Sequence, residues 1–105
     1  MSEPQWLDAL SADDLPADDV TAIVVAGREI ALYTAGDQVY ASDNLCTHGH
    51  ARLCDGFLEG HEIECPLHQG RFDVRDGTPT CDPATEALRT YPVKVEGRRV
   101  FLQID

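Results

Sequence analysis

Basic residues are scarce in this sequence. Eight Lys and Arg stand against nineteen Asp and Glu, which gives a formal net charge of −11 over 105 residues. Nucleic acid and anionic lipid are themselves polyanions, so a chain with this excess of acid repels both. The charge therefore argues against nucleic-acid and membrane-surface partners, and it favours partner proteins with positive patches. For any single carboxylate, solubility is the simpler explanation.

Long hydrophobic runs are also absent. The longest apolar run, residues 21–26, is far too short to cross a bilayer. The first six residues lack the basic start and apolar stretch of a signal peptide. We therefore expect a cytoplasmic protein with no membrane partner. A chain of 105 residues has room for one core, so we expect a single domain over residues 1–105.

Helical signals are few, and glycine turns separate short apolar or alternating runs. These runs lie at residues 20–26, 29–34, 38–41, 91–96 and 99–104. The turns between them carry Gly27-Arg28, Gly36-Asp37 and Gly97-Arg98, where glycine supplies the positive φ of tight hairpin turns. Ser11 can cap one short helical turn before Pro16. The pattern predicts an all-β sandwich or barrel.

The middle of the chain has a different composition. Between Leu45 and Arg71 lie two loops rich in Cys, His, Gly and Pro, joined by an expected hairpin of residues 55–59 and 62–64. This arrangement predicts a small β subdomain at about residues 45–83, inserted in the β base, that presents two loops side by side. Residues 78–83 contain two prolines and are expected to cover the flank of those loops.

Two of the four cysteines fall in a metal-binding pattern. Sixteen residues separate Cys46-Thr47-His48 from Cys65-Pro66-Leu67-His68. Thiolate and imidazole suit both iron–sulfur clusters and zinc. Two adjacent irons need one Cys and one His from each loop, whereas structural zinc more often pairs Cys-x-x-Cys with a distant pair. The spacing predicts one [2Fe–2S] cluster held by Cys46, His48, Cys65 and His68. A zinc-stabilised binding module is the alternative.

The remaining candidates do not fit the ligand spacing. We expect Cys54 and Cys81 to be free thiols in a reducing compartment rather than a disulfide. His50 is expected to be a loop side chain near the cluster, and His61 to be solvated in a hairpin.

The two loops, residues 46–49 and 65–73, resemble the two Rieske boxes. The surrounding chain, including residues 31–33, 40–45 and 90–94, is similar to ferredoxin components of bacterial aromatic-ring-hydroxylating dioxygenases, most closely the naphthalene dioxygenase type. The resemblance implies the Rieske fold and an electron carrier that is not itself an enzyme. Its expected partners are a flavin-containing ferredoxin reductase, which oxidises NAD(P)H, and a terminal Rieske oxygenase. A mobile carrier of this kind is expected to be a monomer.

The resemblance also indicates the class of Rieske protein. High-potential members carry a disulfide at the positions of Ala51 and Leu67, and hydroxyls at those of Gly70 and Phe72. Hydrogen bonds to sulfur stabilise the reduced cluster, so without them we expect a reduction potential near the low end, about −150 mV. The expected contact rim consists of Thr47, Gly49, Pro66, Leu67 and Gln69, with an inward-folded position as the alternative for Leu67.

Two further alternatives share parts of this pattern. An oxygenase subunit needs a second iron site held by two His and a carboxylate, and only His50 and His61 are spare. The small subunit of a nitrite reductase can share the fold, but such subunits often lack the ligands, and all four are present here.

Overall fold

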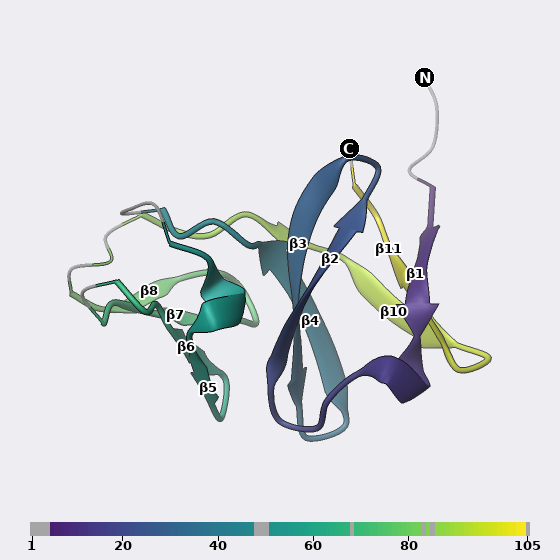
Figure 1. The fold of residues 1–105 in the computed structure, drawn as a ribbon, viewed down its shortest axis with the longest axis horizontal. Helices are drawn as coiled ribbons and strands as arrows, with labels where there is room; N and C mark the ends of the chain where they lie inside the picture. Colours follow the sequence, from purple (N-terminus) through teal and green to yellow (C-terminus); the bar gives the residue numbers. More distant parts are fainter. Residues whose placement is uncertain (1–4, 48–50, 68, 83, 85, 105) are drawn as a thin grey trace.

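The computed structural model describes residues 5–47, 51–67, 69–82, 84 and 86–104, which are almost entirely β-structure in three antiparallel sheets (Figure 1). The strands are β1 (Leu7–Ser11), β2 (Val20–Val25), β3 (Arg28–Ala35), β4 (Gln38–Asp43), β5 (Phe57–Glu59), β6 (Glu62–Glu64), β7 (Arg71–Asp73), β8 (Pro79–Cys81), β9 (Thr90–Tyr91), β10 (Val93–Glu96) and β11 (Arg99–Leu102). Two short 3-10 turns accompany them, η1 (Ala12–Asp14) and η2 (Leu53–Asp55). The all-β prediction is confirmed.

Two of the sheets form a base and the third forms a tip. The base sheets have the strand orders β1-β11-β10 and β2-β3-β4-β9, and the tip sheet has the order β5-β6-β7-β8. Figure 1 shows the tip sheet on one side of β2–β4, with β1, β10 and β11 on the other side. The tip strands fall within the predicted insert of residues 45–83, whose limits stay a prediction. No described helix has the length and apolar character needed to span a membrane.

Strand β3 is buried on both faces and serves two cores. Successive side chains of a strand point to opposite faces. Ile30 and Leu32 pack into the base core with Leu102, whereas Ala31 and Tyr33 pack into the core that holds the tip. All four of these β3 residues are fully buried. The base and the tip are therefore joined through one shared strand.

The hairpin turns follow the predicted glycines, with one shift. Gly97 and Arg98 both have positive φ, 58° and 65°, as primed two-residue turns require. At the first hairpin Val25 pairs with Arg28, so the turn is Ala26-Gly27, one residue earlier than predicted. Ala26 consequently lies in the turn and takes a strained positive φ of 51°.

Other elements differ from the sequence prediction at proline and at the short turns. The run at 91–96 is divided at Pro92, which has no N–H to donate; β9 and β10 consequently belong to different sheets. Strand β5 begins at Phe57 rather than at residue 55, because η2 occupies residues 53–55. The predicted turn after Ser11 is confirmed, since the Asp13 N–H donates to Ser11 Oγ at 3.2 Å. Strands β1, β7 and β8 were not predicted.

Candidate metal centre

The first ligand loop is the end of a narrow two-stranded ribbon. Beyond β4 the chain runs antiparallel to residues 51–53. Its three rungs are Leu53 N–H to the Asn44 carbonyl at 2.7 Å, the Leu45–Arg52 bridge, and Cys46 N–H to the Ala51 carbonyl at 2.9 Å. Cys46 thus occupies the last rung, and residues 47–50 connect the two sides.

The second ligand loop has the same construction. Strands β6 and β7 pair through Glu64 and Arg71, and the next rung is a hydrogen bond from the Cys65 N–H to the Gly70 carbonyl at 2.7 Å. Residues 66–69 then connect the two sides, and Gln69 in this loop has a positive φ of 62°. In both loops, therefore, a cysteine donates its N–H to the carbonyl five residues later.

Both predicted ligand cysteines lie in one apolar core. Cys46 is 5% exposed and Cys65 is fully buried. The same cluster contains Leu53, Ile63 and Phe72, which also have no exposed surface. A thiolate in such surroundings requires a positive partner, because an unpaired buried charge is costly. A bound metal would supply it.

The two predicted histidine ligands, His48 and His68, lie outside the described residues, as do Gly49 and His50. In the sequence each predicted ligand falls within one of the four-residue connections that follow the buried cysteines. The structure therefore brings Cys46 and Cys65 into one core, and the histidine half of the ligand set stays a prediction.

The predicted contact rim is largely exposed. Thr47, Pro66 and Gln69 are exposed, whereas Leu67 is half-buried and packs against the tip core. Leu67 shares a shallow hollow of about 420 Å³ with Ala51, at the two positions where high-potential relatives would carry a disulfide. For Leu67, the inward-folded alternative is thus the better description.

A third segment contacts the first loop from the side and is itself bonded to the turn after β7. The Thr47 Oγ1 hydroxyl donates to the Glu86 carbonyl at 2.8 Å, and the Leu88 N–H donates to the Gly77 carbonyl at 2.8 Å. A Cβ on Gly77 would lie 2.3 Å from the Leu88 carbonyl oxygen, so only glycine allows this close approach. The residue bonded to the first loop is thus Glu86, which is C-terminal to the predicted covering segment 78–83; Pro83 lies outside the described residues.

Arg71 is the centre of a charge cluster below the second loop. Its guanidinium lies 3.0 Å from Glu64, 3.4 Å from Glu62 and 3.5 Å from Glu59. Hydrogen bonds to Glu64 and then to Glu62 raise the pKa of Arg71. Because Glu64 and Arg71 form the strand pair next to Cys65, their ion pair closes the base of the ligand loop.

Tyr33 carries the largest buried polar group near this core. Its hydroxyl lies 2.7 Å from Ser42 Oγ, with both side chains fully buried. Burial raises the pKa of Tyr33 far above its ordinary value, and the hydrogen bond to Ser42 offsets only part of that rise. The phenol is therefore neutral at physiological pH.

The other Cys and His residues that the structure describes differ in burial from the two predicted ligand cysteines. Cys54 is half-buried and Cys81 is exposed, and neither forms a disulfide, as predicted. His61 is exposed, with its ring edge-on to Tyr40 at 6.0 Å. Asn44, a fully buried polar residue next to the first loop, was not predicted from the sequence. An Asn three residues after a predicted strand and two residues before a predicted ligand is the signal that could have found it.

The donor set fits a [2Fe–2S] cluster. Two buried thiols share one core, each at the last rung of a matched loop, and each loop sequence contributes one predicted imidazole. Zinc bound by the same residues would not need this symmetry between two separate hairpins. A [2Fe–2S] cluster would need this symmetry, because one iron would be held by the two thiolates and the other by the two imidazoles.

Comparison with known proteins also indicates a [2Fe–2S] cluster. Residues 5–92 match the family described as the Rieske [2Fe-2S] domain. The chain is 58% identical over 100 residues to the ferredoxin component of the naphthalene 1,2-dioxygenase/salicylate 5-hydroxylase systems of Ralstonia sp., covering 95% of this chain and 96% of that one.

Solved structures agree with the sequence relatives. The ferredoxin of carbazole 1,9a-dioxygenase from Nocardioides aromaticivorans IC177 superposes with a TM-score of 0.92 at 40% identity, covering 96% of this chain and 99% of that chain. A chain from a complex of reduced oxygenase and oxidized ferredoxin in carbazole 1,9a-dioxygenase gives 0.88 at 36% identity, covering 96% and 94%. The protein described here belongs to the Rieske [2Fe-2S] domain family, and its cofactor is one Rieske-type cluster.

Proposed function

We propose that this protein is the electron-transfer ferredoxin of an aromatic-ring-hydroxylating dioxygenase system. It receives single electrons from an NAD(P)H-dependent flavin reductase and passes them to a terminal Rieske oxygenase. The observation that carries this proposal is the pair of buried cysteines at the last rungs of two matched loops, beside an exposed rim. The cluster supplies one reversible electron when bound.

We assign the ligands as Cys46, His48, Cys65 and His68. Burial of the two cysteines keeps water from the sulfur donors, and the backbone rungs fix where each thiolate points. Thr47, Pro66 and Gln69 are exposed around the same loops and would meet a partner. The chain needs no catalytic residues for this role, because it only carries the electron.

The relatives support the choice of partners. Ferredoxin components of dioxygenase systems match nearly the whole chain, and a similar ferredoxin has been observed in complex with its reduced oxygenase. A flavin reductase as electron donor, a monomeric state and a cytoplasmic location complete the proposal. Free thiols at Cys54 and Cys81 suit a reducing compartment.

Purified protein provides the first test. We expect equal amounts of iron and acid-labile sulfide, a brown colour that bleaches with dithionite, and an EPR signal with average g below two in the reduced protein. The ligand variants are Cys46→Ser, His48→Ser, Cys65→Ser and His68→Ser, and each should abolish this signal. The matched controls are Cys54→Ser, Cys81→Ser and His61→Gln, and each should retain it. A colourless zinc protein would contradict the proposal.

The second test measures electron transfer. The protein is mixed with a flavin reductase and a terminal oxygenase of the naphthalene dioxygenase type, and NADH-driven formation of the dihydroxylated product is followed. We expect product to depend on the added ferredoxin. If the holoprotein is reduced by the reductase but never reoxidised by the oxygenase, the assignment of the terminal partner is wrong.

A further inference from the structure

Asn44 is a polar residue with no exposed surface, and both polar atoms of its side chain are hydrogen-bonded. Its Nδ2 donates to Glu29 Oε1 at 2.6 Å and to Cys54 Sγ at 3.3 Å, while its Oδ1 accepts from the Cys54 N–H at 2.9 Å. One amide thus connects the start of β3 with the η2 turn. Buried amides satisfied in this way hold their neighbours firmly, because each broken bond leaves a desolvated polar group.

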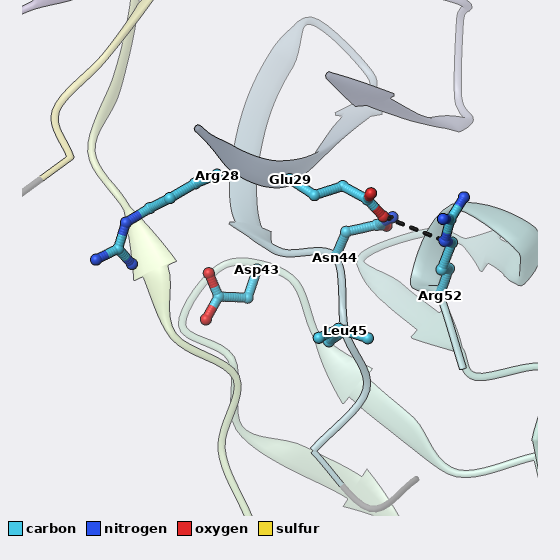
Figure 2. Close-up of a pocket in the computed structure, with 6 residues that line it drawn as sticks. All are labelled: Arg28, Glu29, Asp43, Asn44, Leu45 and Arg52. Atoms are coloured by element: carbon cyan, nitrogen blue, oxygen red, sulfur yellow. Dashed lines mark hydrogen bonds and ion pairs between the residues drawn. The ribbon is translucent and has the colours of Figure 1, made fainter. Parts of the chain in front are cut away.

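The backbone of Asn44 makes the same two connections. Its N–H donates to the Glu29 carbonyl at 3.3 Å, and its carbonyl accepts from the Leu53 N–H at 2.7 Å. Glu29 also pairs with Arg52, Nε to Oε1 at 3.4 Å. Figure 2 shows Glu29 and Asn44 side by side, facing Arg52, along the wall of a hollow of about 440 Å³. This group of side chains lies directly below the Leu45–Arg52 bridge that leads to Cys46.

The two ligand loops differ in what supports them. The second loop extends from β6 and β7, which lie inside a four-stranded sheet. The ribbon of the first loop lies outside the three sheets, and its two sides are joined to each other by the three backbone rungs described above. Its direction relative to the base therefore depends on the contacts at residue 44, where the fully buried side chain of Asn44 adds to the backbone bonds.

We propose that Asn44, held by Glu29, is the positioning residue of the first ligand loop. It fixes the angle at which the ribbon leaves the base and so keeps Cys46 against the cluster. This inference rests on the proposed function, since it assumes that Cys46 is a cluster ligand. It assigns Asn44 no contact with the metal.

A charge swap tests the Asn44–Glu29 hydrogen bond directly. Asn44→Asp replaces the donor by a carboxylate facing Glu29, whereas Glu29→Gln restores a donor on the opposite side. For Asn44→Asp and for Asn44→Ala we expect cluster loss from the holoprotein to be about 10- to 100-fold faster, the usual effect of removing a supporting residue near a metal. The double variant should lose its cluster more slowly than Asn44→Asp alone.

Ser42→Ala is the matched control, because Ser42 is also fully buried and polar and lies two residues earlier on β4. It should lower the melting temperature without altering the EPR g values of the reduced protein. Asn44→Ala should shift those g values in protein that is still folded by circular dichroism.

Two results would overturn the inference. One is that the Asn44 variants keep wild-type g values and lose their cluster only as fast as Ser42→Ala, which would make Asn44 a merely structural residue. The other is that Glu29→Gln fails to rescue Asn44→Asp. Either result, obtained with a wild-type protein that holds its cluster and transfers electrons, leaves the proposed function intact. A wild-type protein without iron and sulfide would overturn both.

Discussion

Gly56 connects η2 to β5 at a place where an added methyl group would meet backbone, and Gly56→Ala is a sharp test of the packing. Its φ of −92° and ψ of −161° suit any residue, so alanine would introduce no backbone strain. A Cβ there would lie 2.0 Å from the Glu64 carbonyl oxygen. The two backbones would have to separate by about 1 Å to relieve that contact, and Glu64 directly precedes Cys65.

Overpacking of this kind costs about 2–3 kcal/mol, and the neighbouring atom is a backbone carbonyl that cannot rotate away. For a domain of this size the loss corresponds to a fall of roughly 10–20 °C in the melting temperature. The assay follows far-UV circular dichroism and cluster absorbance of the holoprotein at one fixed heating rate, because cluster loss makes unfolding irreversible. We also expect faster cluster loss at constant temperature, since the clash displaces Cys65.

Gly60→Ala is the control on the same hairpin. Gly60 has a φ of +60°, and nothing lies within 4 Å of the position that an alanine methyl group would take, so alanine there adds backbone strain of about 1 kcal/mol without a clash. Its cluster should be retained as in the wild type. The reasoning fails if Gly56→Ala melts within a few degrees of the wild type, or if Gly60→Ala loses its cluster faster than Gly56→Ala.

Other contacts lead to three further predictions. A redox titration should give a potential of about −150 mV that changes little near neutral pH, and Phe72→Tyr should raise it if the added hydroxyl reaches a cluster sulfur. Arg75 lies 2.7 Å from Asp73, and its hydrogen bonds lower the pKa of the Asp73 carboxyl group in the folded protein. The pair therefore stabilises the fold fully at pH values above the pKa that Asp73 has in the unfolded chain. That stabilisation is lost as the pH falls through the lower pKa that Asp73 has in the folded protein. In chemical denaturation, the difference in stability between wild type and Asp73→Asn should therefore narrow as the pH falls from neutral through the lowered folded pKa of Asp73, and a difference that widens would contradict the reasoning. Tyr33→Phe should cost about 1 kcal/mol in the same assay, because it removes the buried bond to Ser42, and an unchanged midpoint would show that bond to be neutral.

Local patterns in the sequence were sufficient to predict the fold class and most of the hairpins. Gly97 and Arg98 form the predicted turn, and Ser11 caps the predicted turn of helix. These features depend on a few adjacent residues, which is why they can be read in advance. The first hairpin turn is Ala26-Gly27 rather than Gly27-Arg28, because Val25 pairs with Arg28 across the two strands, and a glycine alone does not fix that register.

Pairings between distant segments could not be predicted. Strand β1 pairs with β11 at the far end of the chain, and no residue near Leu7 signals that partner. The metal site shows the same difference between local patterns, which could be predicted, and contacts between distant residues, which could not. The Cys and His spacing predicted the ligand set, and the structure places both cysteines in one core. The role of Asn44 depends on Glu29, fifteen residues away, so the sequence alone could not disclose it.

The shared strand β3 limits how far the metal-binding half of the molecule can be treated as a portable module. Its alternate side chains, Ala31 and Tyr33, complete the core around Cys46 and Cys65. A fragment of residues 45–83 transplanted into another scaffold would leave that side of the core open to water. A successful graft would have to include β3 and its hairpin partner as well, and so most of the protein.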